Sequence, residues 1–283
     1  MNIGLVLSGG MAKGAYQIGA LKALNNFIPP SEIKYISCAS VGVLNGYAYA
    51  VDRLDQAEAM WKNVCSNDAR YLISQILKSS MLQQNIVNLY DPEKKLDAVF
   101  YSTLLDWVNG RLVYKDISQV DHEKVPQYLK ASVAMPVYNR AVQVDKQSYF
   151  DGAMVDNIPV FPLVKHDLDY VICMYFDDTC YKFETTEFDR KVIKITFPSE
   201  SILRQSVSFT QGSIEKMIKT GYDTTMQLLK LVFVSGYEDL DHIYEMIALL
   251  NRNNRNPTVR ITGDFLVTNL NRITKKLTIR KIL

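Results

Sequence analysis

Short apolar runs alternate with helical periodicity along the first fifty residues of the chain. Residues 3–7 are almost wholly apolar, which is typical of a strand covered on both faces of its sheet. After a glycine turn, apolar residues recur at helical spacing as far as residue 24, and a Pro-Pro pair ends this helix. A second strand over 33–37 and a second helix over 43–51 follow. This alternation predicts a mostly parallel sheet with right-handed crossovers.

The pattern along the rest of the chain is less regular. Residues 54–113 read as helical, and they form either a lid over a site or plain helical packing on the sheet. An amphipathic helix is predicted around 214–234. Strand character returns at 125–132, 149–150, 170–174 and 192–195. We therefore expect an α/β fold in three layers, α/β/α, around a mostly parallel central sheet.

Composition narrows the class of function. A net charge of +2 over 283 residues gives no reason to expect a nucleic-acid partner. The 4 cysteines form no C-x-x-C pair and the 3 histidines lie far apart, so we expect no metal site. The amino terminus lacks the charge and apolar length of a signal peptide, and no stretch approaches the ~20 apolar residues that cross a bilayer. We expect a cytoplasmic protein with free thiols.

Ser40 lies in the segment Cys-Ala-Ser-Val-Gly (38–42), between a predicted strand and a predicted helix. This is the setting of a nucleophile elbow, a turn so tight that the residues two before and two after the serine must be small. Gly42 meets this requirement, and Cys38 is a small but imperfect substitute for the usual glycine. A serine in such a turn is also often only the N-cap of the following helix.

The segment Ser-Gly-Gly-Met-Ala-Lys-Gly (8–14) ends the first strand and opens the first helix. Glycines let a backbone approach a ligand closely, and amides at a helix amino terminus attract an anion, which describes an oxyanion hole. The segment is not a P-loop, because Lys13 is followed by Gly14 instead of Ser or Thr, and it lacks the dinucleotide pattern G-x-G-x-x-G. Without a ligand, the same residues are a plain glycine turn.

Asp151 is followed by Gly152 and comes directly after the strand-like residues 148–150. Taken alone, an Asp-Gly pair is most often a turn. The order of a glycine loop, an elbow serine and a later Asp-Gly resembles the patatin-like phospholipase family, whose motifs are G-G-G-x-R/K-G, G-x-S-x-G and D-G-G/A. Residues 131–136 and 151–160 resemble two further segments of that family. The similarity spans roughly residues 3–165.

The resemblance implies a serine carboxylic-ester hydrolase in which Ser40 is the nucleophile and Asp151 its catalytic partner. The amides of the glycine loop would form the oxyanion hole, and four other residues would support the motifs. The oxyanion residues are Gly9, Gly10 and Met11, and the supporting residues are Lys13, Gly14, Gly42 and Gly152.

The implied activity is that of a lipid acyl hydrolase of the phospholipase A or lysophospholipase type, acting on a lipid or ester substrate without a cofactor or metal ion. Residues 1–165 would form the patatin-like catalytic core. Residues 166–283 would complete the same α/β domain and end in a basic tail from about residue 251. A general esterase for short, soluble esters is a close alternative.

Two residues depart from the family pattern. Met11 stands where a third glycine is usual, so it either narrows the oxyanion hole or fixes a flexible φ angle. Cys38 stands at the elbow's usual first glycine and could strain the turn by on the order of 1 kcal/mol. These departures leave open a non-catalytic or weakly active member that binds lipid or regulates. Lys13 keeps the basic position of the family, where it braces the loop without touching substrate.

Residues 251–283 carry eight basic side chains against Asp264 alone. Such a tail is attracted to anionic lipid headgroups, which would make the protein a peripheral membrane protein. The alternative is a solvated basic tail without a partner. The basic residues are Arg252, Arg255, Arg260, Arg272, Lys275, Lys276, Arg280 and Lys281.

Overall fold

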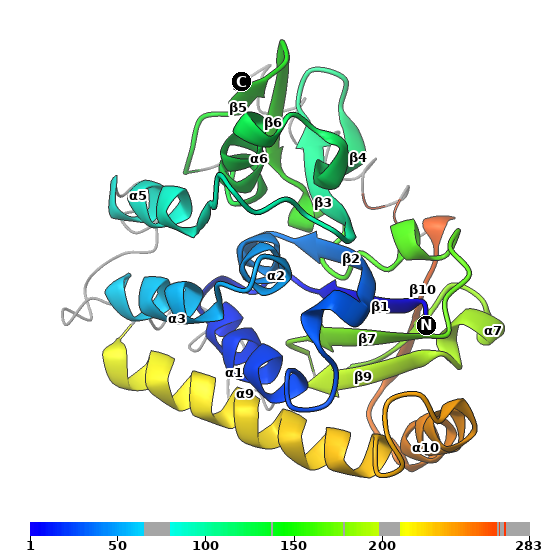
Figure 1. The fold of residues 1–283 in the computed structure, drawn as a ribbon. Helices are drawn as coiled ribbons and strands as arrows, with labels where there is room; N and C mark the ends of the chain where they lie inside the picture. Colours follow the sequence, from blue (N-terminus) through cyan, green and yellow to red (C-terminus); the bar gives the residue numbers. More distant parts are fainter. Residues whose placement is uncertain are drawn as a thin grey trace.

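A computed structural model describes residues 1–64, 80–136, 138–177, 179–197, 210–264, 266 and 269 of the chain. These residues form a central sheet of 8 strands in the order β5-β6-β3-β2-β1-β7-β9, with β4 paired to β3 (Figure 1). The strands are β1 (Ile3–Leu7), β2 (Ile33–Ala39), β3 (Val99–Asp106), β4 (Arg111–Asp116), β5 (Val142–Val144), β6 (Gln147–Asp151), β7 (Tyr170–Tyr175) and β9 (Val192–Thr196).

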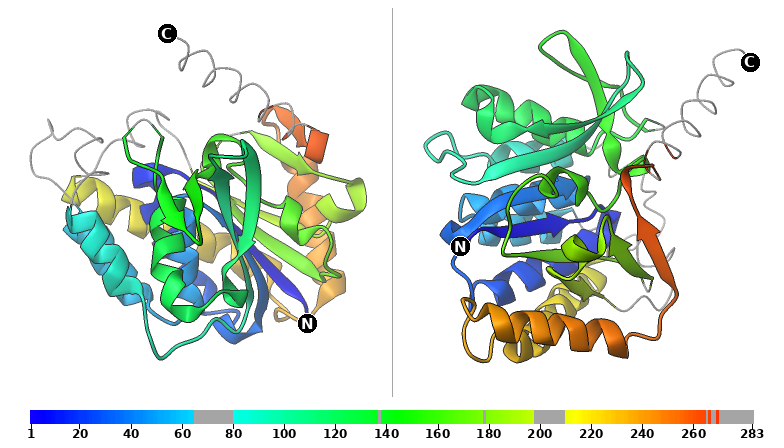
Figure 2. Two further views of the ribbon diagram at one scale, coloured as in Figure 1. Left: turned by 90° about the horizontal axis from the view of Figure 1, so that it is seen from above. Right: turned by 90° about the vertical axis from the view of Figure 1, so that its right-hand side faces the viewer.

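The centre of the sheet is parallel and one end is antiparallel. Strands β1, β2, β3, β7 and β9 run in one direction. Strands β4 and β6 are antiparallel to β3, and β5 is antiparallel to β6. The predicted mostly parallel sheet is therefore confirmed. A separate parallel pair joins β8 (Cys180–Phe183) to β10 (Thr258–Ile261), which rises in orange from the end of α10 in Figure 2.

Helices flank the sheet, and two of them approach unusually closely. A Cβ on Gly19 of α1 would lie 1.8 Å from the Ile218 carbonyl oxygen of α9. A Cβ on Gly221 of α9 would lie 2.0 Å from the Tyr16 carbonyl oxygen of α1. Glycine is therefore required on both sides of this contact. The helices are α1 (Gly14–Leu24), α2 (Val41–Ala50), α3 (Leu54–Asn63), α5 (Ser80–Leu89), α6 (Val125–Ser132), α7 (Thr186–Asp189), α9 (Gln211–Val232) and α10 (Leu240–Asn253).

Both faces of the sheet are buried, as residues 3–7 predict. Leu5 and Leu7 of β1 pack into the larger core together with residues of α1, α2 and α9. Val6 faces the opposite side of the sheet and packs into a second core, which also contains Phe183 of β8. This core includes residues of the segment that contains η5 (Gly152–Met154) and η6 (Phe161–Leu163). Among the described helices, none combines the length and apolar character needed to span a membrane.

Two predicted segments were wrong. Residues 125–132 form helix α6 and not a strand, because the buried Val125, Tyr128, Leu129 and Ser132 repeat at helical spacing. Residues 54–113 are only partly helical, since they also hold β3 and β4, joined by a short turn. The lid interpretation of this region depends in part on residues 65–79, which lie outside the described residues.

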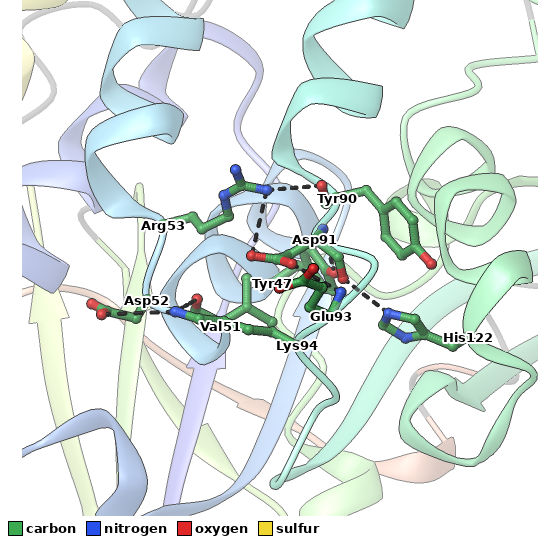
Figure 3. Close-up of polar contacts among 9 residues, drawn as sticks. All are labelled: Tyr47, Val51, Asp52, Arg53, Tyr90, Asp91, Glu93, Lys94 and His122. Atoms are coloured by element: carbon green, nitrogen blue, oxygen red, sulfur yellow. Dashed lines mark hydrogen bonds and ion pairs between the residues drawn. The ribbon is translucent and has the colours of Figure 1, made fainter.

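The connection from α5 to β3 is held by polar contacts at the end of α2 (Figure 3). Arg53 Nη1 donates to the Tyr90 carbonyl oxygen at 2.8 Å, and Lys94 Nζ donates to that of Val51 at 2.9 Å. His122 Nε2 lies 2.9 Å from the Asp91 carbonyl oxygen. These contacts hold residues 90–94 of the segment that leads into β3, the strand on which the site described below is built.

Candidate active site

Ser40 stands on the sharp turn between β2 and α2. Its φ of 53° and ψ of −131° lie in a region that L-residues rarely adopt, which costs ~1–3 kcal/mol where neighbouring structure enforces it. The Ser40 hydroxyl makes no capping hydrogen bond to α2. The N-cap interpretation of this serine therefore does not hold, and the strained turn points its side chain elsewhere.

Close packing around the elbow requires its small residues. A Cβ on Gly42 would lie 2.6 Å from the Leu7 carbonyl oxygen at the end of β1. Cys38 belongs to β2 and is fully buried, and its Sγ would lie 2.7 Å from a Cβ on Gly46. Gly46 thus supplies the space that the Cys38 side chain takes where the family has glycine.

The register of β3 brings Ser40 and Asp151 together. Strand β2 ends beside the first half of β3, with Ala39 opposite Thr103. Strand β6 runs in the opposite direction beside the second half of β3 and ends with Asp151 opposite Leu104. Strand β4 occupies the other edge of β3 over both halves, so β2 and β6 meet end to end on one edge. Their last residues are therefore neighbours.

Asp151 lies beside the Ser40 hydroxyl in the lining of one cavity and is only 3% exposed. Burial raises the pKa of its carboxyl to about 7, although the Ser40 hydroxyl and the Ala153 amide, at 2.9 Å from Oδ1, favour the charged form. The Asp151 amide donates to the Ala134 carbonyl oxygen at 2.9 Å, which ties the family-like segment 131–136 to the site. A carboxyl with this pKa can act as a base near neutral pH.

The glycine loop lies directly on the serine. A Cβ on Gly9 would be 2.8 Å from the Ser40 Cβ. The Gly9 amide donates to the Asn157 carbonyl oxygen at 3.2 Å, so it already has a backbone acceptor, and its oxyanion role stays a prediction. For the amides of Gly10 and Met11, no acceptor is found within the described parts of the chain. Met11 adopts a φ of 52°, a left-handed conformation that favours glycine.

Lys13 and Gly14 support the loop. Lys13 is buried, and its Nζ donates to the Phe176 carbonyl oxygen at 3.1 Å and lies 5.5 Å from the centroid of the Phe176 ring. A Cβ on Gly14 would lie 2.6 Å from Trp61. These contacts anchor the loop to the end of β7 and to α3. A Cβ on Gly152 would lie 2.8 Å from the Thr103 carbonyl oxygen, so this glycine lets the Asp151 turn lie on β3.

A cavity of about 500 Å³ opens beside the two proposed catalytic residues. Part of its wall comes from beyond residue 164, chiefly the end of β7, β8 and β10. Its apolar lining includes Met11, Met135, Met154, Ile158, Tyr175, Phe176, Ile261 and Leu266. The volume lies within the range of ~300–1,000 Å³ that small-molecule sites occupy.

Asp156 and Asn157 also line this cavity, although no motif in the sequence predicts a role for either residue. Asp156 is 3% exposed, and burial raises the pKa of its carboxyl to about 6. The Tyr114 hydroxyl of β4 donates to Asp156 Oδ2 at 2.6 Å. The segment 151–160 resembles the family in sequence, but nothing in the sequence connects it to Tyr114, because that contact depends on the pairing of β4 with β3.

No histidine is found in the described lining of the cavity. His122 belongs to the contacts of Figure 3, His166 stacks on Tyr35, and His242 lies 3.0 Å from the Leu231 carbonyl oxygen. The part of the chain that the structure describes also contains no cluster of His, Cys, Asp and Glu fit to hold a metal ion. Asp151 is a titratable group that lies beside Ser40 in this lining.

The sequence model of the patatin-like phospholipases matches residues 5–164, which is more than half of the chain. The chain belongs to the patatin-like phospholipase family. It is thereby placed in a class of lipid hydrolases, and the predicted family is confirmed. Its matched segment contains the glycine loop, Ser40 and Asp151.

The fold of this patatin-like phospholipase is similar to that of VipD from Legionella pneumophila, with a TM-score of 0.51 at 15% sequence identity over 81% of this chain and 67% of that one. The type III effector protein ExoU aligns with a TM-score of 0.39 at 15% identity, over 87% of this chain and 53% of that one. The chain thus spans about half the length of ExoU. No curated protein sequence is similar enough to count as a relative.

Proposed function

We propose that the protein hydrolyses carboxylic esters of lipids, in the manner of a phospholipase A or lysophospholipase, with Ser40 as nucleophile and Asp151 as its base. One observation carries the proposal: a serine on a strained elbow lies beside a buried carboxyl group whose pKa is raised by burial to about 7. A serine hydroxyl becomes an effective nucleophile when such a base removes its proton during attack.

In the proposed reaction, Ser40 Oγ attacks the ester carbonyl carbon while Asp151 accepts the hydroxyl proton. The amides of Gly10 and Met11 stabilise the tetrahedral oxyanion. Where single oxyanion donors have been removed from other enzymes, the loss is roughly 2.7–4 kcal/mol. Asp151 returns the proton to the leaving alcohol and then takes one from the water that hydrolyses the acyl-enzyme.

The substrate class is proposed from the cavity. Its apolar wall suits a fatty acyl chain, since burial of each CH₂ group is worth about 0.8 kcal/mol. The wall formed by Ile261 and Leu266 lies beyond the matched family segment, so acyl-chain preference in this chain is set partly by its own carboxyl-terminal part.

The test is labelling of the purified protein with a fluorophosphonate, which reacts with an activated serine, followed by mass spectrometry of the adduct. We expect labelling at Ser40 that is abolished in Ser40→Ala and Asp151→Ala and unchanged in Ser118→Ala, a serine outside the cavity lining. A labelled wild-type protein would then be assayed against phospholipids and lysophospholipids. A folded wild-type protein that resists labelling would support the non-catalytic, lipid-binding alternative.

Peripheral membrane contact through the basic tail is proposed as a second property. Arg252, Arg255 and Arg260 lie in the described part of the chain, and all three side chains are exposed. Arg260 Nη1 donates to the Glu184 carbonyl oxygen at 2.6 Å. The other five basic residues lie outside the described residues. We expect the protein to co-sediment with anionic vesicles. Added salt, or replacement of these three arginines with Gln, should reduce the amount of protein that co-sediments.

A further inference from the structure

We propose that Asn157 is a positioning residue that holds the glycine loop, residues 8–14, in place over Ser40. The inference rests on the proposed function, because it assigns the loop amides to the oxyanion. Asn157 belongs to neither the glycine loop, the elbow nor the Asp-Gly pair, and it acts through contacts to backbone atoms of the loop.

Asn157 bonds to both backbone groups of Gly9. Its carbonyl oxygen accepts from the Gly9 amide at 3.2 Å, and its side-chain Nδ2 donates to the Gly9 carbonyl oxygen at 3.2 Å. Its Oδ1 would lie 2.5 Å from a Cβ on Gly9. Gly9 is therefore enclosed between Asn157 and Ser40, and its peptide planes can rotate only if these hydrogen bonds break.

The segment that carries Asn157 is itself anchored. The Val155 and Asp156 amides donate to the Gly152 carbonyl oxygen at 2.9 and 3.1 Å. Asp156 Oδ1 accepts from the Ile158 amide at 3.2 Å while its Oδ2 accepts from Tyr114 at 2.6 Å. The turn after Asp151 thus forms one unit, with the proposed base at its start and the contact to the loop near its end.

This arrangement has a chemical consequence. The Gly10 amide follows the Gly9 carbonyl in the same peptide unit, so the donor on the Gly9 carbonyl fixes the direction in which the Gly10 N–H points. A displacement of catalytic groups by 1 Å can cost on the order of 10²-fold in rate. Loss of the Asn157 side-chain donor should therefore lower kcat more than it raises KM.

The experiment compares Asn157→Asp with Asn157→Ala. Asp keeps the shape of the side chain but replaces the donor with an acceptor facing the Gly9 carbonyl oxygen, whereas Ala removes the side chain. We expect fluorophosphonate labelling of Ser40 to slow about 10-fold in Asn157→Ala and about 10²-fold in Asn157→Asp, measured above pH 8 where Asp151 is ionised. Ester hydrolysis should show the same order in kcat with little change in KM.

A space-filling role predicts the reverse order, with Asp close to wild type and Ala slower, and that result would overturn the proposal. Tyr114→Phe, which removes the anchor from Asp156, should slow labelling in the same direction by a smaller factor. Hydrogen–deuterium exchange of residues 8–14 gives a readout that needs no turnover, and we expect about 10-fold faster exchange in both Asn157 variants. An unlabelled wild-type protein would refute the proposed function alone, whereas unchanged loop exchange would refute this inference.

Discussion

Thr103 and Leu104 are consecutive residues of β3, yet Thr103 pairs with the last residue of β2 and Leu104 with the last residue of β6. The ends of β2 and β6 therefore meet at this point of β3, and Ser40 and Asp151 lie side by side at this junction. The Asp151 turn crosses it at Gly152, where a Cβ would lie 2.8 Å from both the Leu104 amide nitrogen and the Thr103 carbonyl oxygen. Backbone atoms cannot move aside as the end of a flexible side chain can, so Asp151 would have to move instead.

Gly152→Ala is accordingly expected to slow fluorophosphonate labelling by on the order of 10²-fold and to lower the melting temperature. The control is Gly212→Ala in α9, where a Cβ would meet nothing within 4 Å. That variant should label at the wild-type rate. Equal rates in Gly152→Ala and wild type would show that Asp151 does not depend on this junction.

The labelling rate should depend on pH through Asp151. Its carboxyl must be ionised to act as a base, and burial raises its pKa to about 7. The rate should therefore rise with pH and level off above about 8, and at pH 6 it should be about one tenth of the plateau. A rate that stays constant between pH 5 and 8 would exclude a base with this pKa.

Asp151→Asn should make the fold more stable at high pH while it abolishes labelling. The folded-state pKa of Asp151 lies above its ordinary value, so the folded state binds the proton more tightly than the unfolded state. Wild-type stability therefore falls as pH rises from about 4 to 7, and Asn avoids this loss. The gain in unfolding free energy at pH 8 should be on the order of 1–4 kcal/mol and should shrink toward pH 4, as measured by urea unfolding.

Cys38 and Gly46 should behave as a coupled pair. A Cβ at position 46 would lie 2.7 Å from Cys38 Sγ, so Gly46→Ala alone should destabilise the fold by about 1–3 kcal/mol. Cys38→Gly vacates the space, and the double variant should recover part of that loss. Additive free energies in this double-mutant cycle would mean that Gly46 does not accommodate the thiol.

Ile261 should influence the length of acyl chain that the enzyme accepts. It lines the cavity from β10 and is 8% exposed. Ile261→Trp should lower kcat/KM for esters of long acyl chains about 10-fold relative to butyryl esters. Val259→Trp, two residues earlier on β10 and outside the cavity lining, is the matched control and should leave the ratio unchanged. A ratio unaffected by Ile261→Trp would place the acyl chain elsewhere.

Much of the parallel half of the fold is determined by the local sequence. The apolar run at 3–7, the glycine segment at 8–14 and the small residues around Ser40 act on their own backbones, so strand, loop, elbow and helix could be predicted there. The order of motifs likewise identified the family. At residues 125–132 the pattern was ambiguous, and a strand was predicted where the structure has helix α6. The segment is short, and a short apolar run does not by itself distinguish a strand from a helix.

Only the tertiary structure decided how distant segments meet. Three contacts of the site depend on how the strands are paired. They are the end-to-end meeting of β2 and β6 along β3, the hydrogen bond of Tyr114 with Asp156, and the position of Ile261 in the cavity wall. The hydrogen bond from the Gly9 amide to the Asn157 carbonyl oxygen likewise joins segments that are far apart in the chain. The physical reason is that these contacts form between surfaces far apart in the chain, whose pairing is set by the packing of the whole sheet and not by the residues beside them.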